Sequence, residues 1–354
     1  MAYTTIKKPS DYFNTVQWTG NNTSTRSITG VGFQPDLTWK KERNASFSIG
    51  HMLYDSLRGL GVNKHLDSST TGAEGDGNDE VFGYFTSFDT DGFSVSNGSS
   101  GNDYVNNPSY NYVAWNWLAS NTTASNTDGS ITSTVSANTT SGFSIVSYTG
   151  TGANATVGHG LGSEAKMVIV KNRDQADAWY SYHASLGGTK YMSFNSTGGA
   201  ATGSTLWQDT DPTSSVFSIG TNNVVNTSGE NYIAYCFADV KGFSKFGSYT
   251  GNGNADGTFI YTGFKPAFIM IKSSSSTGTN WFMLDNKRNT YNIVNTYLMA
   301  DSNAVDQSAD MLDITSNGFK QRNTYNNLNG SGVSYIYMAF AEEPLVGDNP
   351  ATAR

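Results

Sequence analysis

One internal repeat limits what this chain can fold into more than any other feature of its sequence. The stretch Tyr232 to Gly251 joins the end of one copy to the start of the next. Its aromatic-rich front half recurs at 112–117 and 335–340, and its Gly-Phe-Ser back half recurs at 142–150. A unit of about a hundred residues is therefore predicted to occur three times, and each copy is expected to fold as one module.

Landmarks inside the copies keep their order and spacing. Each copy opens on an aromatic-Thr-Gly step, continues with an apolar run that ends in a lysine, reaches a phenylalanine, and closes with an aromatic strand. The aligned residues are Thr19, Thr149 and Thr250; Lys40, Lys171 and Lys272; and Phe93, Phe217 and Phe319. We expect Lys171 to be structurally equivalent to Lys272, and Tyr232 to Tyr335.

Composition indicates β structure. Charged residues make up 14% of the chain, against roughly 25% in an average soluble domain. Gly, Ser, Thr and Asn are abundant and aromatic residues reach 13%, which suits short strands, tight turns and a core of rings in each module. We therefore predict an all-β protein of three tandem antiparallel β-sandwich (jelly-roll-like) modules.

The repeat also predicts the domain plan. It consists of an N-terminal docking arm (1–11), module one (12–118), a Ser/Thr/Asn-rich linker (119–141), module two (142–239), module three (242–343) and a C-terminal tail (344–354). Within the linker, 131–135 alternates as an edge strand would. The arm carries Lys7, Lys8 and Pro9 and is expected to be extended and free to dock, with a solvated tail as the alternative.

Charge and cysteine content exclude several classes of protein. A net charge of -8 and a pI near 4.9 argue against a nucleic-acid binder. The single cysteine, Cys236, cannot form an intrachain disulfide. The N-terminus has no apolar leader, and no run of 18 apolar residues occurs. We expect a protein that folds in a cytoplasm and does not insert into a membrane.

The residues that invite a catalytic or metal-binding interpretation do not form a known motif. The four histidines, His51, His65, His159 and His183, lack zinc-ligand spacing, and we expect packed or surface side chains. The acidic loop 74–80 has the oxygen ligands that Ca²⁺ needs, although a solvated acidic loop is the interpretation we favour.

Asp55 and Asp285 lie at comparable places in modules one and three, each three residues before an arginine. A glycosidase needs two carboxylates that face each other across a cleft, but module two has His183 at this place. A turn with a local Asp–Arg pair is the favoured interpretation. We predict no catalytic, cofactor-binding or metal-binding residues, and a protein that is not an enzyme.

Taken together, the motifs resemble a family. They include Gly32-Phe33-Gln34-Pro35, Gly263-Phe264-Lys265-Pro266, Asp91-Gly92-Phe93 and Asn317-Gly318-Phe319. This order is similar to an uncharacterised repeat module of tailed-bacteriophage virion proteins, common in phages of marine bacteria and cyanobacteria and usually labelled tail fibre or virion structural protein. Module two departs most, because Gly160-Leu161-Gly162 replaces Gly-Phe-x-Pro there.

The resemblance implies a protein of the virion surface that is synthesised in the host cytoplasm. Its implied partners are other virion proteins, sister copies in a homo-oligomer such as a trimer, and host surface glycans. A tail-associated fibre or adhesin is the first hypothesis. A capsid decoration (cement) protein is the second, because no fibre-shaft pattern occurs, and a glycan-degrading virion enzyme is the third. We expect the arm and module one to hold the protein to the particle, with module three outermost.

Overall fold

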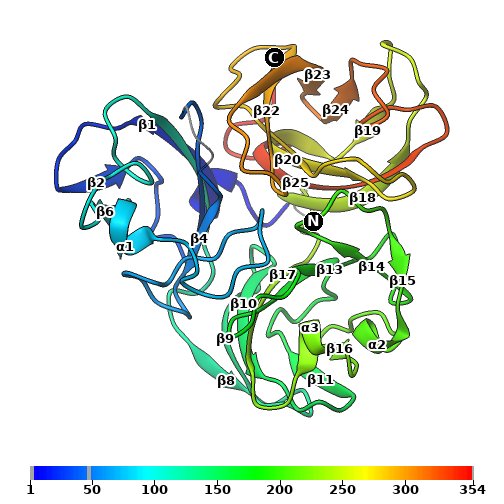
Figure 1. Cartoon of the computed structure of the whole chain (residues 1–354). Coiled ribbons are helices and arrows are strands. Elements are labelled where there is room, and N and C mark those ends of the chain that lie inside the picture. The colour runs from blue at the N-terminus through cyan, green and yellow to red at the C-terminus, as the bar shows by residue number, and fades with distance from the viewer. Residues whose placement is uncertain (1–3, 46–48, 353–354) are drawn as a thin grey trace.

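Three β-sandwich modules meet around a common axis in the computed structural model, which describes residues 4–45 and 49–352 (Figure 1). All the sheets are antiparallel. The predicted fold class, all-β with three antiparallel sandwich modules, is confirmed.

Each module contains the same four-stranded unit, in which the opening strand pairs with the closing strand and two further strands follow. In module one the order is β1 (Phe13–Thr19), β7 (Asn111–Trp117), β3 (Leu37–Glu42) and β4 (Met52–Asp55). In module two it is β10 (Phe143–Thr149), β17 (Asn231–Phe237), β12 (Met167–Asn172) and β13 (Tyr180–His183). In module three it is β18 (Ser244–Thr250), β25 (Ser334–Pro344), β20 (Phe264–Ser273) and β21 (Phe282–Asp285).

The remaining elements complete each sandwich. Module one adds β2 (Thr25–Thr29), β6 (Gly92–Ser96) and β5 (Tyr84–Asp89) as a second sheet, and α1 (Asp79–Phe82). Module two adds β14 (Lys190–Ser193), β15 (Ala201–Thr202), β9 (Ser133–Asn138) and β8 (Ala124–Asn126) to its first sheet, with β11 (Ala155–Gly158) paired to β16 (Val216–Ile219), α2 (Ser204–Trp207) and α3 (Asn223–Asn226). Module three continues through β22 (Val294–Met299), β23 (Gln307–Thr315), β24 (Gly318–Gln321) and β19 (Phe259–Tyr261) into a nearly closed, barrel-like sheet.

The aromatic-Thr-Gly step is explained by a contact that each module repeats. In module three, Tyr249 stacks on the closing tyrosine Tyr335 with ring centroids 4.9 Å apart, and its hydroxyl donates to the Leu328 carbonyl at 2.6 Å. The matching pairs are Trp18 on Tyr112 and Tyr148 on Tyr232, each 5.2 Å apart. Aromatic stacking and a satisfied polar tip together fix the opening strand against the loop before the closing strand.

The glycine of the same step is required by a close backbone approach. A Cβ on Gly150 would lie 2.2 Å from the Thr227 carbonyl oxygen. A Cβ on Gly20 or Gly251 would lie 1.9 Å or 2.3 Å from a carbonyl oxygen of the corresponding loop. Only glycine lets the backbones come this close.

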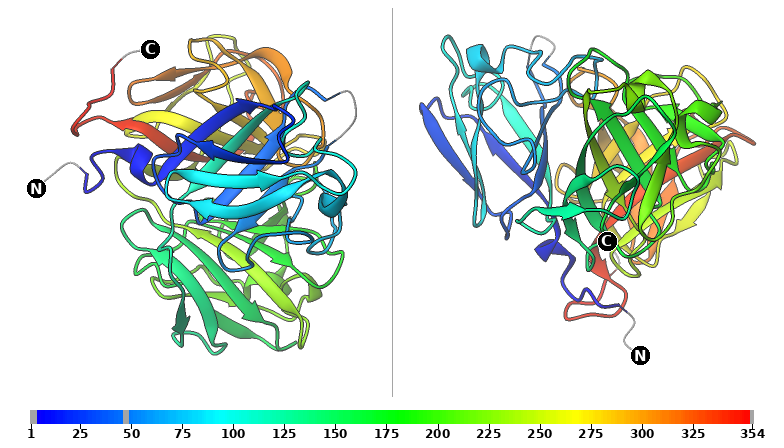
Figure 2. Two further views of the ribbon diagram at one scale, coloured as in Figure 1. Left: turned by 90° about the vertical axis from the view of Figure 1, so that its left-hand side faces the viewer. Right: turned by 90° about the horizontal axis from the view of Figure 1, so that it is seen from below.

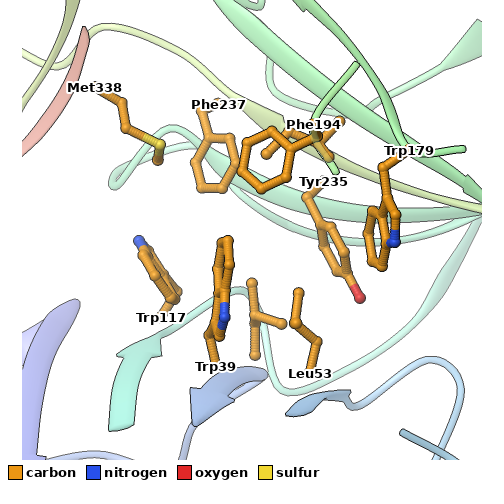
Figure 3. Close-up of a pocket in the computed structure, with 10 residues that line it drawn as sticks. Trp39, Leu53, Trp117, Trp179, Phe194, Tyr235, Phe237 and Met338 are labelled. Atoms are coloured by element: carbon orange, nitrogen blue, oxygen red, sulfur yellow. The ribbon is translucent and has the colours of Figure 1, made fainter. Parts of the chain in front are cut away.

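The four-stranded units bury both of their faces. One face covers the interior of its own module, and the other meets the corresponding faces of the other two modules in a shared central core. The centre keeps a cavity of about 10 Å³, lined by apolar and aromatic side chains from all three modules (Figure 3). In this view Trp39 and Trp117 of module one face Phe237 of module two, with Met338 of module three beside them. The modules therefore share a core in addition to having one each.

Strand register corrects one predicted equivalence. The closing tyrosines Tyr112, Tyr232 and Tyr335 lie opposite Glu42, Asn172 and Ser273, the residues directly after Lys41, Lys171 and Lys272. Lys171 and Lys272 are equivalent as predicted, but their partner in module one is Lys41. Assigning Lys40 was wrong by one residue, because two adjacent lysines in Leu-Thr-Trp-Lys-Lys cannot be separated by spacing alone. A one-residue slip places a side chain on the opposite face of the strand.

The predicted linker and the predicted arm are both packed against the modules, and the edge strand predicted at 131–135 overlaps β9. Within the predicted linker 119–141, β9 pairs with β10 and β8 pairs with β9, so this segment forms an edge of module two's sheet. In the predicted docking arm, η1 (Pro9–Asp11) follows Ile6, which is 1% exposed in the central core. The expectation of a free, extended arm was wrong for the described residues, because one apolar side chain anchors it.

None of the helices in the described part of the chain has the length and apolar character needed to cross a bilayer.

Candidate functional site

The predicted Asp–Arg turns are confirmed, and they join modules. In module one, Arg58 Nε donates to Asp55 Oδ2 at 2.5 Å, and the backbone N–H of Arg58 donates to Asp55 Oδ1 at 2.9 Å. Tyr235 of module two donates its hydroxyl to the same Asp55 Oδ2 at 2.8 Å. Asp55 is 0% exposed, so its carboxylate is held inside the boundary between modules one and two.

The same turn in module three faces module one. Arg288 Nε donates to Asp285 Oδ2 at 2.6 Å, and Trp115 Nε1 of module one donates to that oxygen at 3.1 Å. Burial alone would raise the pKa of Asp285, but Arg288 and these hydrogen bonds lower the pKa below its ordinary value of 3.8. Asp55 and Asp285 hold two different boundaries, so they do not face each other across a cleft as a glycosidase pair would.

Module two closes the ring with a different pair. His183 lies at the position of Asp55 and Asp285, opposite Met167 in the strand register. At the position of Trp115 and Tyr235, module three has Met338, whose side chain has no donor. His183 Nε2 instead lies 3.2 Å from the Tyr337 carbonyl of module three. The module that lacks the acid therefore faces the module that lacks the donor.

Three of the four predicted histidines are fixed by backbone groups. His51 Nδ1 accepts from Trp39 Nε1 at 2.8 Å, so its Nε2 carries the proton that is given to the Met299 carbonyl of module three. His159 and His183 are bound in the same manner, to the Thr213 and Tyr337 carbonyls. Burial lowers the pKa of all three, to about 4 for His183. His183 is packed, as predicted.

The prediction of a solvated acidic loop at 74–80 holds for part of the loop, because Asp76 and Asn78 are exposed while Glu74 and Asp79 are held by other side chains. Glu74 contacts Lys64 at 3.0 Å and Arg173 of module two at 2.6 Å. Asp79 is buried, and one of its oxygens accepts from the Tyr54 hydroxyl at 2.8 Å and lies 3.1 Å from His65 Nδ1. Among the described residues, no three His, Cys, Asp or Glu side chains form a group that could hold a metal ion. Cys236 is also buried, which raises the pKa of its thiol.

Module one contains a polar cavity of about 240 Å³. Its lining combines module one with a single residue of module three, Asn303; the lining residues are Ile49, Gly50, His51, Met52, His65, Asp67, Thr70, Asp76, Gly77, Asn78, Tyr104 and Asn303. Asp67 Oδ1 accepts from the His51 backbone N–H at 3.0 Å and from Ser69, and burial raises the pKa of Asp67.

Module three contains an aromatic cavity of about 200 Å³. Its lining comes from the barrel-like sheet and from the loop before β25, and consists of Phe282, Tyr297, Ala309, Met311, Tyr325, Asn327 and Leu328. The rings of Phe282 and Tyr297 lie 5.1 Å apart at 47°. Barrel mouths are a common location for ligand sites.

The two cavities occupy the same place in their modules. Met52 and Phe282 are register equivalents. Met52 pairs with Lys40 between β4 and β3, and Phe282 pairs with Ile271, the equivalent of Lys40, between β21 and β20. His65 and Tyr297 are equivalent because Leu66 and Leu298 pair with Leu53 and Met283. Tyr104 and Asn327 form the third equivalent pair. The closing tyrosine of each module donates its hydroxyl to the carbonyl of the preceding residue, Asp103 in module one and Asn326 in module three. Three equivalent positions line both cavities, so the site is built into the module.

Module two keeps an aromatic pair at this place. Tyr180 and Tyr191 are the equivalents of Phe282 and Tyr297, and their rings lie 4.7 Å apart at 43°. The ring geometry of the pair is therefore conserved between modules two and three, while module one replaces it with a methionine and a histidine.

Lys40 is a further peculiarity of module one. Its register equivalents are Val170 and Ile271, both in module cores. The ammonium group is fully buried, 3.7 Å from Met52 Sδ and 5.0 Å from the Tyr112 ring centroid. Burial lowers the pKa of Lys40 to about 7. Met52 and Tyr104, which lie beside the amine, also line the polar cavity.

Comparison with known families gives one result. A family model described as "Domain of unknown function (DUF7483)" matches residues 8–344. The chain belongs to this family. No curated protein and no solved structure matches the chain. The DUF7483 match spans all three modules as one unit, which agrees with their shared central core.

In this DUF7483 chain the cavities lie at the end of the ring remote from the termini. In module three, Tyr335, near the start of β25, donates to the Asn326 carbonyl, next to the cavity residue Asn327. Lys7 and Asp348 form an ion pair of 3.7 Å beyond the other end of that strand. The 11 residues of β25 span about 35 Å at ~3.3 Å per residue. Figure 2 shows both termini leaving the same end.

Sequence reasoning named His51, His65 and the acidic loop 74–80, which line the polar cavity of module one, but it did not bring them together, and it found none of the residues of the module-three cavity. Insertions of different length separate Lys171 from Tyr191 and Lys272 from Tyr297, so the fixed spacings that revealed the repeat fail there. A search for one aromatic residue on each of the two strands that follow the lysine strand would have found the pairs of modules two and three.

Proposed function

We propose that this DUF7483 chain is a non-enzymatic surface protein of a bacteriophage particle, a tail-associated fibre or adhesin that contacts host glycans. The observation that carries the proposal is the cavity at a repeated position, lined by different chemistry in modules one and three. A module whose framework is constant and whose pocket varies suits recognition of surface ligands, because the pocket can change without changing the core.

The direction of the cavities supports the same proposal. They lie toward one end of the ring, and the termini leave from the other. A protein attached to a particle at the terminal end would present its cavities outward. The buried histidines and aspartates support a non-enzymatic role, because their hydrogen bonds join modules and strands.

A capsid decoration protein is the second candidate. It is favoured by the closed three-module ring, which contains no shaft in the part of the chain that the structure describes. A single chain with approximate three-fold symmetry would also fit a three-fold site of a shell without forming a trimer.

Two experiments test the proposal. Fluorescently labelled protein should bind host cells, and periodate oxidation of the cell-surface glycans should reduce that binding; binding that is absent or insensitive to periodate would count against glycan contact. Cryo-EM of purified particles should place the ring on the tail with its cavity end outward. Density on the capsid shell would favour decoration, and a particle that lacks the chain would refute both candidates.

A further inference from the structure

We propose that the module-three cavity is a binding site for one neutral pyranose ring, held between Tyr297 and Tyr325. The inference rests on the proposed contact with glycans and adds to it the site and the class of sugar. It starts from side-chain polar groups that make no hydrogen bond within the fold.

Three polar groups at this cavity have no partner among the described residues. The hydroxyls of Tyr297 and Tyr325 and the side-chain amide of Asn327 make no hydrogen bond there, whereas the more deeply buried tyrosines of the same module, Tyr249 and Tyr335, donate to backbone carbonyls. Burial and the nearby Tyr325 raise the pKa of Tyr297, so its hydroxyl stays protonated and able to donate at neutral pH. Unpaired donors at a concave site suit a hydroxylated ligand.

The walls supply apolar surface beside these donors. Phe282 and Met311 are each 2% exposed and form the floor, while Tyr325 is 48% exposed at the rim. Aromatic rings present large, rigid, amphipathic surface at a small entropy cost. A pyranose has the matching form, with an apolar C–H face and hydroxyls around its edge.

Charge and size narrow the ligand further. None of the seven lining residues has a carboxylate, an ammonium or a guanidinium group. An anionic sugar would therefore lose hydration without gaining an ion pair. The volume of about 200 Å³ is below the roughly 300–1,000 Å³ of pockets for drug-sized ligands. The cavity therefore suits one neutral ring of a longer glycan.

The location argues against a chance depression on the surface. Its framework recurs as Tyr180 with Tyr191 in module two, and as Met52 with His65 in the polar cavity of module one. In module one the same place carries Asp67, His51 and His65, so its ligand chemistry differs. Of the two cavities, only the one in module three has a neutral, aromatic lining.

The test uses the full chain and saturation-transfer NMR with the methyl glycosides of glucose, galactose, mannose and N-acetylglucosamine, and with methyl glucuronide as the charged counterpart. We expect at least one neutral glycoside to bind and the glucuronide to bind more weakly. Tyr325→Ser and Tyr297→Leu should each weaken binding by roughly tenfold, the effect of losing one stacked ring. Tyr297→Phe should retain most of it, since the ring remains.

Tyr261→Ser is the matched control, because Tyr261 is 57% exposed in the same module and lines a different depression. Unchanged melting temperatures confirm that each variant folds. Binding that survives Tyr325→Ser and Tyr297→Leu, or that Tyr261→Ser removes, overturns the site while the proposed glycan contact stands. If no glycoside binds the wild-type chain and a glycan array is blank, the site and the glycan contact both fail. If the array is positive and the cavity variants bind it as wild type does, only the site fails.

Discussion

The hydrogen bond from Tyr235 to Asp55 gives a direct test of how the modules are joined. Tyr235→Phe removes only the hydroxyl that donates across the boundary at 2.8 Å and leaves the ring in the central core. Asp55 keeps Arg58 as its partner, so the variant isolates the contact between modules one and two.

The expected loss follows from the burial of the pair. Both side chains are almost completely buried, and a hydrogen bond to a charged group contributes about 1.5–3 kcal/mol. Unfolding entropy of roughly 2.1 cal/mol/K per residue gives about 0.7 kcal/mol/K for a chain of 354 residues. The substitution should therefore lower the melting temperature by roughly 2–4 °C.

A double-mutant cycle separates this contact from general damage. We would measure the free energy of unfolding by denaturant titration for Tyr235→Phe, Asp55→Asn and the double variant. The coupling energy should be about 1–2 kcal/mol, because each single variant breaks the same bond. The matched cycle pairs Tyr235→Phe with Asp285→Asn, whose partner is Trp115, and its coupling should stay within about 0.5 kcal/mol.

Equal coupling in the two cycles would refute the reasoning, as would a Tyr235–Asp55 coupling within about 0.5 kcal/mol. Either result would mean that the boundary is held by apolar packing and that the acid contributes nothing specific to it.

Three further outcomes are expected. Lys40→Met should raise the free energy of unfolding at pH 7. The extra stability of the Lys40→Met variant over the wild type should shrink by up to ~1.4 kcal/mol per pH unit between about pH 7 and 10.5. In this range the lysine of the unfolded wild type holds a proton that the folded wild type has lost, so the wild type gains stability as the pH rises. A difference in unfolding free energy that does not change with pH would contradict this. Gly150→Ala should cost more than ~2 kcal/mol because its Cβ meets a carbonyl oxygen at 2.2 Å, whereas Gly198→Ala, with no atom nearer than 3.5 Å, should be nearly neutral by the same titration. Residues 119–241 expressed alone should bind a hydrophobic dye and aggregate, since they expose their face of the central core; a monomeric, dye-free fragment would show that module two folds independently.

The three-fold repeat and the β-sandwich class could be predicted because they depend on local pattern. Aromatic-Thr-Gly and the closing aromatic strand recur at nearly fixed spacing, and each encodes a contact within one module, such as Tyr249 on Tyr335. The shared core could not be predicted in this way. Both faces of β3, β12 and β20 are buried, and an apolar run does not say whether a second sheet or a second module covers it.

The same limit explains the predicted linker and the predicted free arm. Polar composition made 119–141 resemble a linker, although Ser and Thr side chains suit an edge strand with one solvated face. The arm was judged by Lys7, Lys8 and Pro9, yet Ile6 decides its position by entering the central core. One buried apolar side chain outweighs several exposed charges in fixing a short segment.

The sequence difference in module two acquires a physical meaning only in three dimensions. The loss of the acid at His183 suggests a degenerate module when the copies are compared in isolation. Around the ring, each residue at this position faces a particular residue of another module. Asp55 accepts from the Tyr235 hydroxyl, and Asp285 accepts from Trp115 Nε1. His183 lies at the boundary where Met338 has no donor to offer. An acid at 183 would be a buried charge without its donor, which is costly, while a neutral imidazole that donates to a backbone carbonyl is satisfied. The three copies have therefore diverged as pairs across boundaries, which requires that they assemble in a fixed cyclic order.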